Sequence, residues 1–183
     1  PLIVMEERSI GPGLGADSVA AGQVAAIVGL VLVIIYMILS YGFFGVLANI
    51  ALAVNITLIL GTLSFIQATL TLPGIAGIVL TMGMAVDANV LVFERIREEL
   101  RRGRNVMAAI EGGYQRAIST IIDSNLTTLF AALFLYGFGS GPIRGFAVTL
   151  AIGIITSLFT AVMVTRMLII IWLERKRPRE LVL

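Results

Sequence analysis

The sequence of 183 residues contains no cysteine and no histidine, and only 13% of its residues are charged. Without cysteine, the chain forms no disulfides and has no thiol chemistry. Without histidine, a side chain that carries a proton near neutral pH has to be a carboxylate, assisted by water or arginine. The net charge of +2 is small and the basic residues are clustered, so the composition does not support nucleic-acid binding.

Patterns for enzymatic chemistry are also missing from the sequence. It offers no nucleophile beside a base, no metal-ligand cluster and no phosphate-binding loop. We therefore expect that the protein is not an enzyme and that it uses neither a metal nor a cofactor.

Apolar residues, in contrast, are abundant. They make up 58% of the chain and the mean hydropathy is +1.03, whereas soluble domains are about 45–50% apolar. A helix that spans a bilayer needs roughly 20 apolar residues, and five runs approach this length: about 20–40, 46–66, 74–93, 118–138 and 145–172. The runs do not alternate as barrel strands do. The sequence therefore predicts an all-α membrane protein, a polytopic bundle of five transmembrane helices.

The segments outside these runs differ in composition. Residues 1–18 mix glycine, proline and charge, which is typical of the tail of an extracytoplasmic domain followed by a loop into the membrane. The bundle is expected over 19–174, with a polar loop at 94–117, and a basic tail follows at 175–183. Because the chain begins with Pro1 and has no signal peptide, we expect it to be a piece of a longer protein.

Basic residues set the expected orientation of the bundle. If five helices alternate across the membrane, the arginine-rich 94–117 loop and the 175–183 tail lie on the same side. The positive-inside rule makes that side cytoplasmic. The N-terminal end is then expected outside the cytoplasm and the C-terminus inside it.

The 94–117 loop itself shows helical signals. Its charges follow one another at the three- and four-residue spacing of helical ion pairs, as Glu94–Arg97, Glu98–Arg101 and Glu98–Arg102. Gly103 suits the end of this helix, and Asn105 suits the start of the next. We expect a helical hairpin at the cytoplasmic face. It is either a solvated segment that only fixes topology or a docking surface.

Small residues recur at four-residue spacing in two of the runs, which places them on one helix face. The row in the third run contains Gly77, and the row in the fifth run contains Gly145 and Gly153. Gly83 lies outside these rows, one helical turn before Asp87. Such faces let membrane helices approach closely. The pattern fits ordinary packing within one bundle, or a face along which helices slide.

Three charged residues lie inside predicted spans, namely Asp87, Asp123 and Arg166. Counted at 1.5 Å per residue from the cytoplasmic edge of its own helix, each lies roughly 10–12 Å deep. Asn89 and Asn125 are near them in sequence. An ionisable residue at such depth is costly, and it is a functional candidate by default.

These charges can be accommodated in two ways, because burial favours a protonated carboxyl whereas a nearby cation favours the ionised form. Arg166 is the only cation at this depth in the sequence, and we expect it to pair with Asp123 as a mainly structural contact. Asp87 is then without a fixed partner, which makes it the candidate for a proton relay. The alternative is a neutral Asp87 that hydrogen-bonds to a neighbouring helix.

Four stretches of the sequence then resemble a known family. They are "EERSIGPGLG" (6–15), "LPGIAGIVLTMGMAVDANVLVFERIREEL" (72–100), "GYQRAISTIIDSNLTTL" (113–129) and "GFAVTLAIGIITSLFTAVMVTR" (145–166). Together they closely resemble the SecD/SecF family of bacterial protein-export proteins, within the resistance–nodulation–division (RND) superfamily of proton-driven transporters. The resemblance covers essentially the whole chain, and the wording around "VDANVLVFERI" is specific.

The resemblance implies an architecture and partners. A half of this type has six spans, so this chain is expected to hold the last five and the tail of the large extracytoplasmic region. The resemblance implies a bacterial cytoplasmic (inner) membrane protein that acts with SecF, the SecYEG channel, the SecA motor and a preprotein, driven by proton flow. Asp87 takes the position of the family's essential fourth-helix aspartate, which faces SecF. Asp123 matches a D-x-N-x-T-T run that implies no firm role.

Two rival functions stay open. The first is half of an RND exporter of small molecules or lipids, which "EERSIGPGLG" and the wording of the helices disfavour. The second is a membrane scaffold without ion flow, in which the charges only lock helices together. Export that depends on the proton gradient, tested with Asp87→Asn in the full-length protein, separates the scaffold from the leading interpretation.

Overall fold

The computed structural model describes residues 12–176, with side chains from Asp17 onward, and residues 1–11 and 177–183 lie outside that description. The elements of the described part are all helices, and it contains no strand, as predicted: α1 (Pro12–Phe65), α2 (Leu72–Arg101), α3 (Val106–Phe138), α4 (Pro142–Phe159), the π-helical segment η1 (Thr160–Val164) and α5 (Thr165–Lys176). Helix α1 begins within the 1–18 segment. Of the 175–183 tail, only Arg175 and Lys176 are described.

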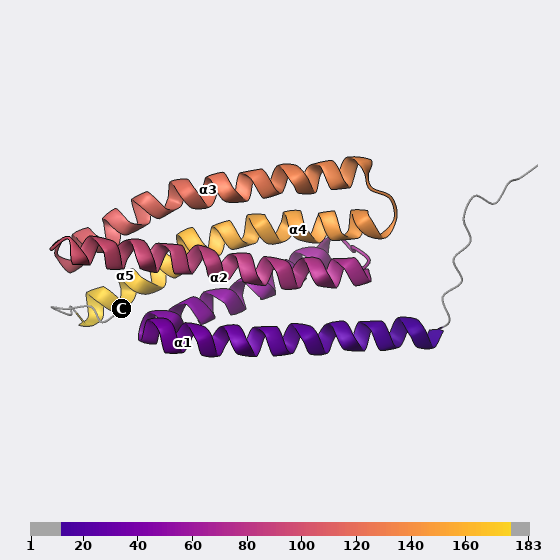
Figure 1. Cartoon of the computed structure of the whole chain (residues 1–183), viewed down its shortest axis with the longest axis horizontal. Coiled ribbons are helices and arrows are strands. Elements are labelled where there is room, and N and C mark those ends of the chain that lie inside the picture. Colours follow the sequence, from indigo (N-terminus) through magenta and orange to yellow (C-terminus); the bar gives the residue numbers. More distant parts are fainter. Residues whose placement is uncertain (1–11, 177–183) are drawn as a thin grey trace, which may run out of the picture.

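Four helical stretches in residues 12–176 are long and apolar enough to cross a membrane. They are Asp17–Phe65, Leu72–Arg101, Val106–Phe138 and Pro142–Lys176. The last one joins α4, η1 and α5 end to end, and it lies lengthwise beside α2 and α3 (Figure 1). The fold is thus that of a multi-pass helical membrane protein.

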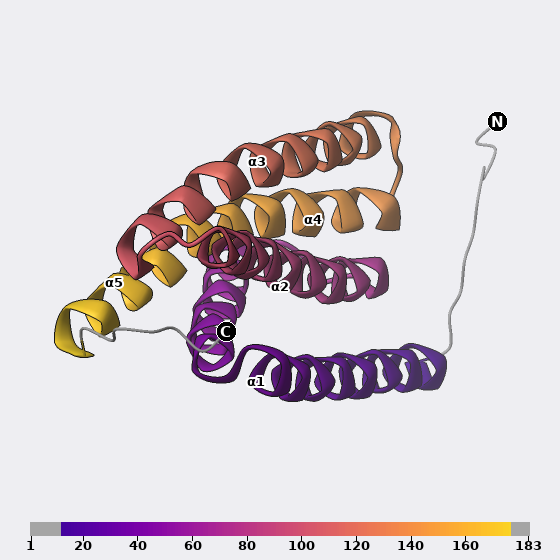
Figure 2. The ribbon, with the colours of Figure 1, turned by 60° about the vertical axis from the view of Figure 1, so that its left-hand side comes forward.

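Helix α1 folds back on itself at Gly42, whose φ of 52° and ψ of −123° are accessible to glycine and strained for other residues. Asn49 Nδ2 donates to the Ile34 carbonyl at 3.3 Å, although residues this far apart in a straight helix are separated by about 22 Å. Helix α1 therefore has a first arm, 17–41, and a second arm, 43–65, which diverge from this turn (Figure 2).

The turn between α2 and α3 follows the capping signals in the sequence. Gly103 has a φ of 80° directly after α2, and Asn105 Oδ1 accepts the Ala108 N–H at 2.8 Å. Both predicted roles are confirmed. Residues 94–117 form a hairpin from the last turns of α2 and the first turns of α3, and we call this end of the bundle the polar end.

The main apolar core lies where both arms of α1 meet α2, the start of α3 and α5. The Phe44 ring packs edge-on against Phe93 and Trp172, with centroid distances of 5.7 Å and 5.6 Å. Beyond its first turns, α3 exposes large apolar side chains, among them Phe130 and Phe134. The core is thus concentrated towards the polar end, while much of α3 faces the surroundings.

Glycines allow α2 and α4 to approach closely, and α2 packs more extensively on α4 than on any other helix. An added Cβ would crowd a threonine of the facing element at three positions: Gly77 against Thr149, Gly145 against Thr71 and Gly153 against Thr81. At Gly153 that Cβ would lie 2.5 Å from the Cβ of Thr81. Gly83 differs, because it is exposed and an added Cβ there meets nothing within 4 Å.

Candidate functional site

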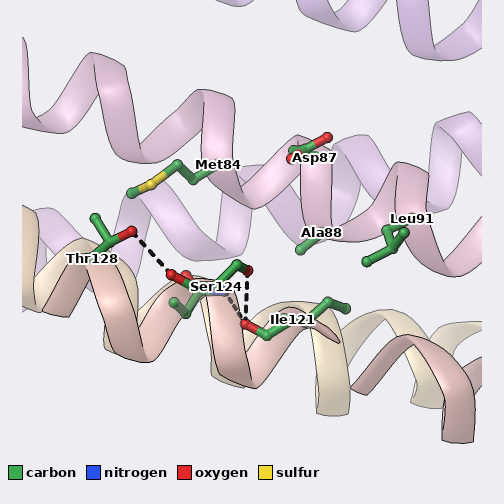
Figure 3. Close-up of a pocket in the computed structure, with 8 residues that line it drawn as sticks. Met84, Asp87, Ala88, Leu91, Ile121, Ser124 and Thr128 are labelled. Carbon is green, nitrogen blue, oxygen red and sulfur yellow. Dashed lines mark hydrogen bonds between the residues drawn. The ribbon is translucent and has the colours of Figure 1, made fainter. Parts of the chain in front are cut away.

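Asp87 lies on the exposed side of α2, beside a cleft of about 150 Å³ between α2 and α3. The cleft is lined by Met84, Asp87, Ala88 and Leu91 of α2 and by Ile121, Ser124, Asn125 and Thr128 of α3. In Figure 3 the carboxylate of Asp87 is turned away from Ser124 and Thr128. Its side chain has no hydrogen bond or ion pair to any described residue.

The polar residues on the α3 wall of this cleft hydrogen-bond to their own helix. Ser124 Oγ and Asn125 Nδ2 both donate to the Ile121 carbonyl, at 3.1 Å and 2.8 Å. Thr128 Oγ1 donates to the Ser124 carbonyl at 3.0 Å. These bonds use the hydroxyl donors and leave the hydroxyl lone pairs as acceptors. A cleft of this size with such groups has room for several water molecules.

Asp123 and Arg166 do not meet. Asp123 is exposed on α3, and within residues 12–176 it forms no ion pair with Arg166. The Arg166 guanidinium instead lies over the Tyr114 ring, 5.7 Å from its centroid. Tyr114 precedes Asp123 by about 13 Å along α3, so Arg166 extends towards the polar end, as long cationic side chains in membrane helices commonly do. Arg166 thus forms a cation–π contact with Tyr114, and the expected salt bridge with Asp123 is not present in the described chain.

Asn89 faces the opposite way from Asp87. It is 3% exposed, its Nδ2 donates to the Ala85 carbonyl at 3.2 Å, and its Oδ1 accepts the Thr165 hydroxyl at 2.9 Å. Of the residues named from the sequence, Asp87 and Asn125 therefore share the cleft, whereas Asn89 links α2 to α5.

The polar end holds a cluster that the sequence reasoning missed. Glu99 is fully buried, and its carboxylate meets three guanidinium groups: Arg102 Nη1 at 2.8 Å, Arg104 Nε at 2.9 Å and Arg116 Nη1 at 3.0 Å. Because Arg116 belongs to α3, the cluster ties α3 to α2. The signal in the sequence was the stripe Val92–Ile96–Glu99, which continues the buried face of α2 into its charged segment.

Four further charges at the polar end, Glu94, Arg95, Arg97 and Glu98, are also paired. The predicted pairs Glu94–Arg97 and Glu98–Arg102 are present, at 2.6 Å and 2.7 Å, while the second partner of Glu98 is Arg95 rather than Arg101. The Tyr41 hydroxyl of α1 donates to Glu94 Oε1 at 3.0 Å. The α2 part of this hairpin is therefore tied to α1 through Glu94 and Arg97, whose guanidinium lies 5.3 Å from the centroid of the Tyr41 ring.

Within residues 12–176, no three Asp, Glu, His or Cys side chains are grouped so that they could hold a metal ion. What the helices offer instead is Asp87 and Asp123, two carboxylates that are exposed on apolar helices and unpaired within the described chain. The fold and these side chains define a class, a multi-pass helical membrane protein with outward-facing carboxylates inside its spans.

The family follows from sequence comparison. The family described as "Protein export membrane protein SecD/SecF, C-terminal" matches residues 3–175, and this chain belongs to it. Over 181 residues the chain is 56% identical to the protein translocase subunit SecD of Magnetococcus marinus and 59% identical to that of Rickettsia typhi. These matches cover 99% of this chain but only 34% and 35% of the relatives. The chain thus spans about a third of their length.

A solved structure shares the fold. The crystal structure of SecDF from Thermus thermophilus, described as a translocon-associated membrane protein, superimposes with a TM-score of 0.90 at 46% identity. A crystal structure of SecDF in a super-membrane-facing form gives a TM-score of 0.84. Each match covers 94% of this chain and 24% of the solved chain.

Proposed function

We propose that this chain is the transmembrane part of a Sec protein-export accessory subunit that couples proton flow to preprotein translocation. It acts together with SecF and the SecYEG channel, beside the SecA motor, in the bacterial cytoplasmic membrane. The family and the translocase names of the relatives support the setting. The single observation that carries the proton role is Asp87, a carboxylate unpaired among the described residues, on the outer face of α2 beside a cleft whose α3 wall carries polar side chains.

The position of Asp87 suits a proton relay. Water in the cleft can exchange a proton with the carboxyl, helped by the lone pairs of Ser124 and Thr128. The carboxylate is turned away from those hydroxyls (Figure 3), so a group on a neighbouring subunit can take the proton over. The protonated acid is neutral and tolerates the apolar surroundings, whereas the ionised acid requires a polar partner or water.

The proposed topology counts five spans, because the two arms of α1 each have the length of a single span. A bilayer core of about 30 Å accommodates about 20 helical residues, and the 49 residues from Asp17 to Phe65 exceed that length twofold. The turn at Gly42 and the polar end then lie on the same side. The concentration of arginine there supports a cytoplasmic placement for this side and for the C-terminus.

The rival scaffold function assigns the intramembrane charges to locking helices together. Within residues 12–176, Asp87 and Asp123 hold no other helix, whereas Arg166 contacts α3 through Tyr114. The charged pair that connects α2 to α3 lies at the polar end. This distribution favours the proton relay over the scaffold.

The deciding experiment is proton-gradient-dependent export in membrane vesicles that contain the full-length protein with Asp87→Asn. We expect the gradient-dependent part of export to be lost and the ATP-driven part to remain. Asp17→Asn, an exposed aspartate at the other end of the first arm, serves as the matched control and should leave export unchanged. Full gradient-dependent export by Asp87→Asn would exclude the relay.

A further inference from the structure

The rod formed by α4 and α5 is interrupted by a π-helical segment, the five residues Thr160–Val164. The Thr165 N–H donates to the Thr160 carbonyl, five residues earlier, and not to the carbonyl four residues earlier. Such a segment contains one residue more than a regular helix, so each later residue is rotated by about 100° relative to an uninterrupted α-helix. The segment therefore decides which side chains of α5 face α2 and α3.

Two contacts of α5 depend on this rotation. Thr165 is fully buried, and its hydroxyl lies 2.9 Å from Asn89 Oδ1 and 3.2 Å from the Thr160 carbonyl. The next residue, Arg166, lies over the Tyr114 ring. Without the extra residue, both side chains would point in other directions and lose these partners.

Asn89 sits two residues after Asp87 on α2, which corresponds to a rotation of about 200° around the helix. Asn89 is buried while Asp87 is exposed. A bond that fixes Asn89 against α5 therefore also fixes the direction in which Asp87 points and its distance from the α3 wall of the cleft.

The parts of the rod on either side of the π-segment pack on different elements. Helix α4 is held on α2 through Gly153 and Thr81. Helix α5 packs on the turn of α1, where the Trp172 ring lies 5.1 Å from that of Phe43. The Asn89–Thr165 bond connects α2 to the rod at the point where these two packing partners change.

We propose that Asn89 and Thr165 are positioning residues for Asp87, and that their hydrogen bond, which the π-segment makes possible, holds the face of α2 that presents Asp87 to the cleft. This inference rests on the proposed function only because that function makes Asp87 the proton relay. The other ionisable side chains on elements packed against α2 in this region include Tyr36, Tyr41, Tyr114, Asp123 and Arg166, and none of them bonds to Asp87 within the described chain.

The test uses the full-length protein in proteoliposomes and measures how fast a lipid-soluble carbodiimide labels Asp87 as a function of pH, with the labelling of Asp123 as the internal reference. Thr165→Val removes the hydroxyl and keeps the shape of the side chain. We expect the Asp87-to-Asp123 labelling ratio to change by about two- to tenfold, the range that one lost hydrogen bond produces. Thr165→Ser retains the hydroxyl and should restore the ratio of the parent protein.

Thr156→Val is the matched control, because the Thr156 hydroxyl bonds only to the Gly153 carbonyl of its own helix, at 3.1 Å. It should leave the ratio unchanged. Asn89→Ala removes the same hydrogen bond from the other side and should change the ratio in the same direction as Thr165→Val. This second variant decides the question if Thr165→Val does not reach the membrane.

An unchanged ratio in the folded variants that lack the bond would overturn the positioning role. The labelling reports the surroundings of Asp87 whether or not it carries protons. A changed labelling ratio together with full export by Asp87→Asn would therefore support the positioning role and exclude the relay. An unchanged ratio together with lost gradient-dependent export by Asp87→Asn would exclude the positioning role and support the relay.

Discussion

The buried carboxylate at the polar end of this bundle and the two carboxylates in its apolar middle have opposite surroundings. At the polar end, Glu99 is buried and meets three arginines, one of them from another helix. In the middle, Asp87 and Asp123 are exposed and unpaired among the described residues. We infer that the ion pairs of Glu99 stabilise the fold, whereas Asp87 and Asp123 are available to water or to another chain.

Of the substitutions that test this difference, we expect Glu99→Ala to have the largest effect on stability. Glu99→Ala leaves three arginines without their shared carboxylate, and breaking a buried ion pair costs about 3–5 kcal/mol. Because the three guanidinium groups are about half exposed, water offsets part of the loss, and we expect about 3 kcal/mol. Thermal unfolding of the full-length protein in detergent should show a large drop in Tm.

Glu98→Ala is the control for that measurement. Its carboxylate also meets two arginines, but the pairs are exposed, and such pairs contribute little. A drop in Tm as large as that of Glu99→Ala would mean that burial of Glu99 does not distinguish the two sites.

The next effect concerns the glycines of the apolar middle. Gly153→Leu forces a side chain into Thr81 and should lower the stability of the protein by about 1–3 kcal/mol, as overpacking does. Thr81→Gly in the same chain should restore part of the loss. Gly83→Leu meets open space, so it should leave Tm unchanged while weakening association with a partner at the Asp87 face. An equal loss of stability at Gly83 would contradict this difference.

The smallest expected effect on stability concerns Arg166, which contacts Tyr114 and not Asp123. Arg166→Met removes the cation–π contact with Tyr114 and should lower stability by about 0.5–2 kcal/mol. A double-mutant cycle with Tyr114→Leu should show a coupling energy of that size. The same cycle with Asp123→Asn should show almost none, and a large coupling to Asp123 would restore the salt bridge that we expected from the sequence.

Much of the fold could be predicted because it follows from local patterns. The apolar runs predicted helices, and the signals at Gly103 and Asn105 were confirmed as the end of one helix and the cap of the next. The pairs Glu94–Arg97 and Glu98–Arg102 followed from spacing alone. These features depend only on residues within a few positions of one another, so the sequence contains all the information they require.

The candidate site could be predicted only in part. Asp87 was recognisable as a charge in an apolar run, but the neighbours of each charge depend on how helices rotate against one another. Arg166 illustrates the failure, because sequence depth suggested Asp123 while the π-segment and the length of the side chain brought it to Tyr114. The one extra residue of the π-segment rotates all later side chains about the helix axis, and no local sequence pattern indicated this segment.

By itself, the sequence determined the helical character of the chain, the turn between α2 and α3, and the identity of the ionisable residues inside the apolar runs, because these depend on hydropathy and short-range spacing. The tertiary structure alone decided that three arginines converge on Glu99, that Asn89 bonds to Thr165, and that Asp87 faces outward beside a cleft between α2 and α3. These outcomes depend on the rotation and close approach of helices distant in the chain, which packing sets and spacing along the sequence does not.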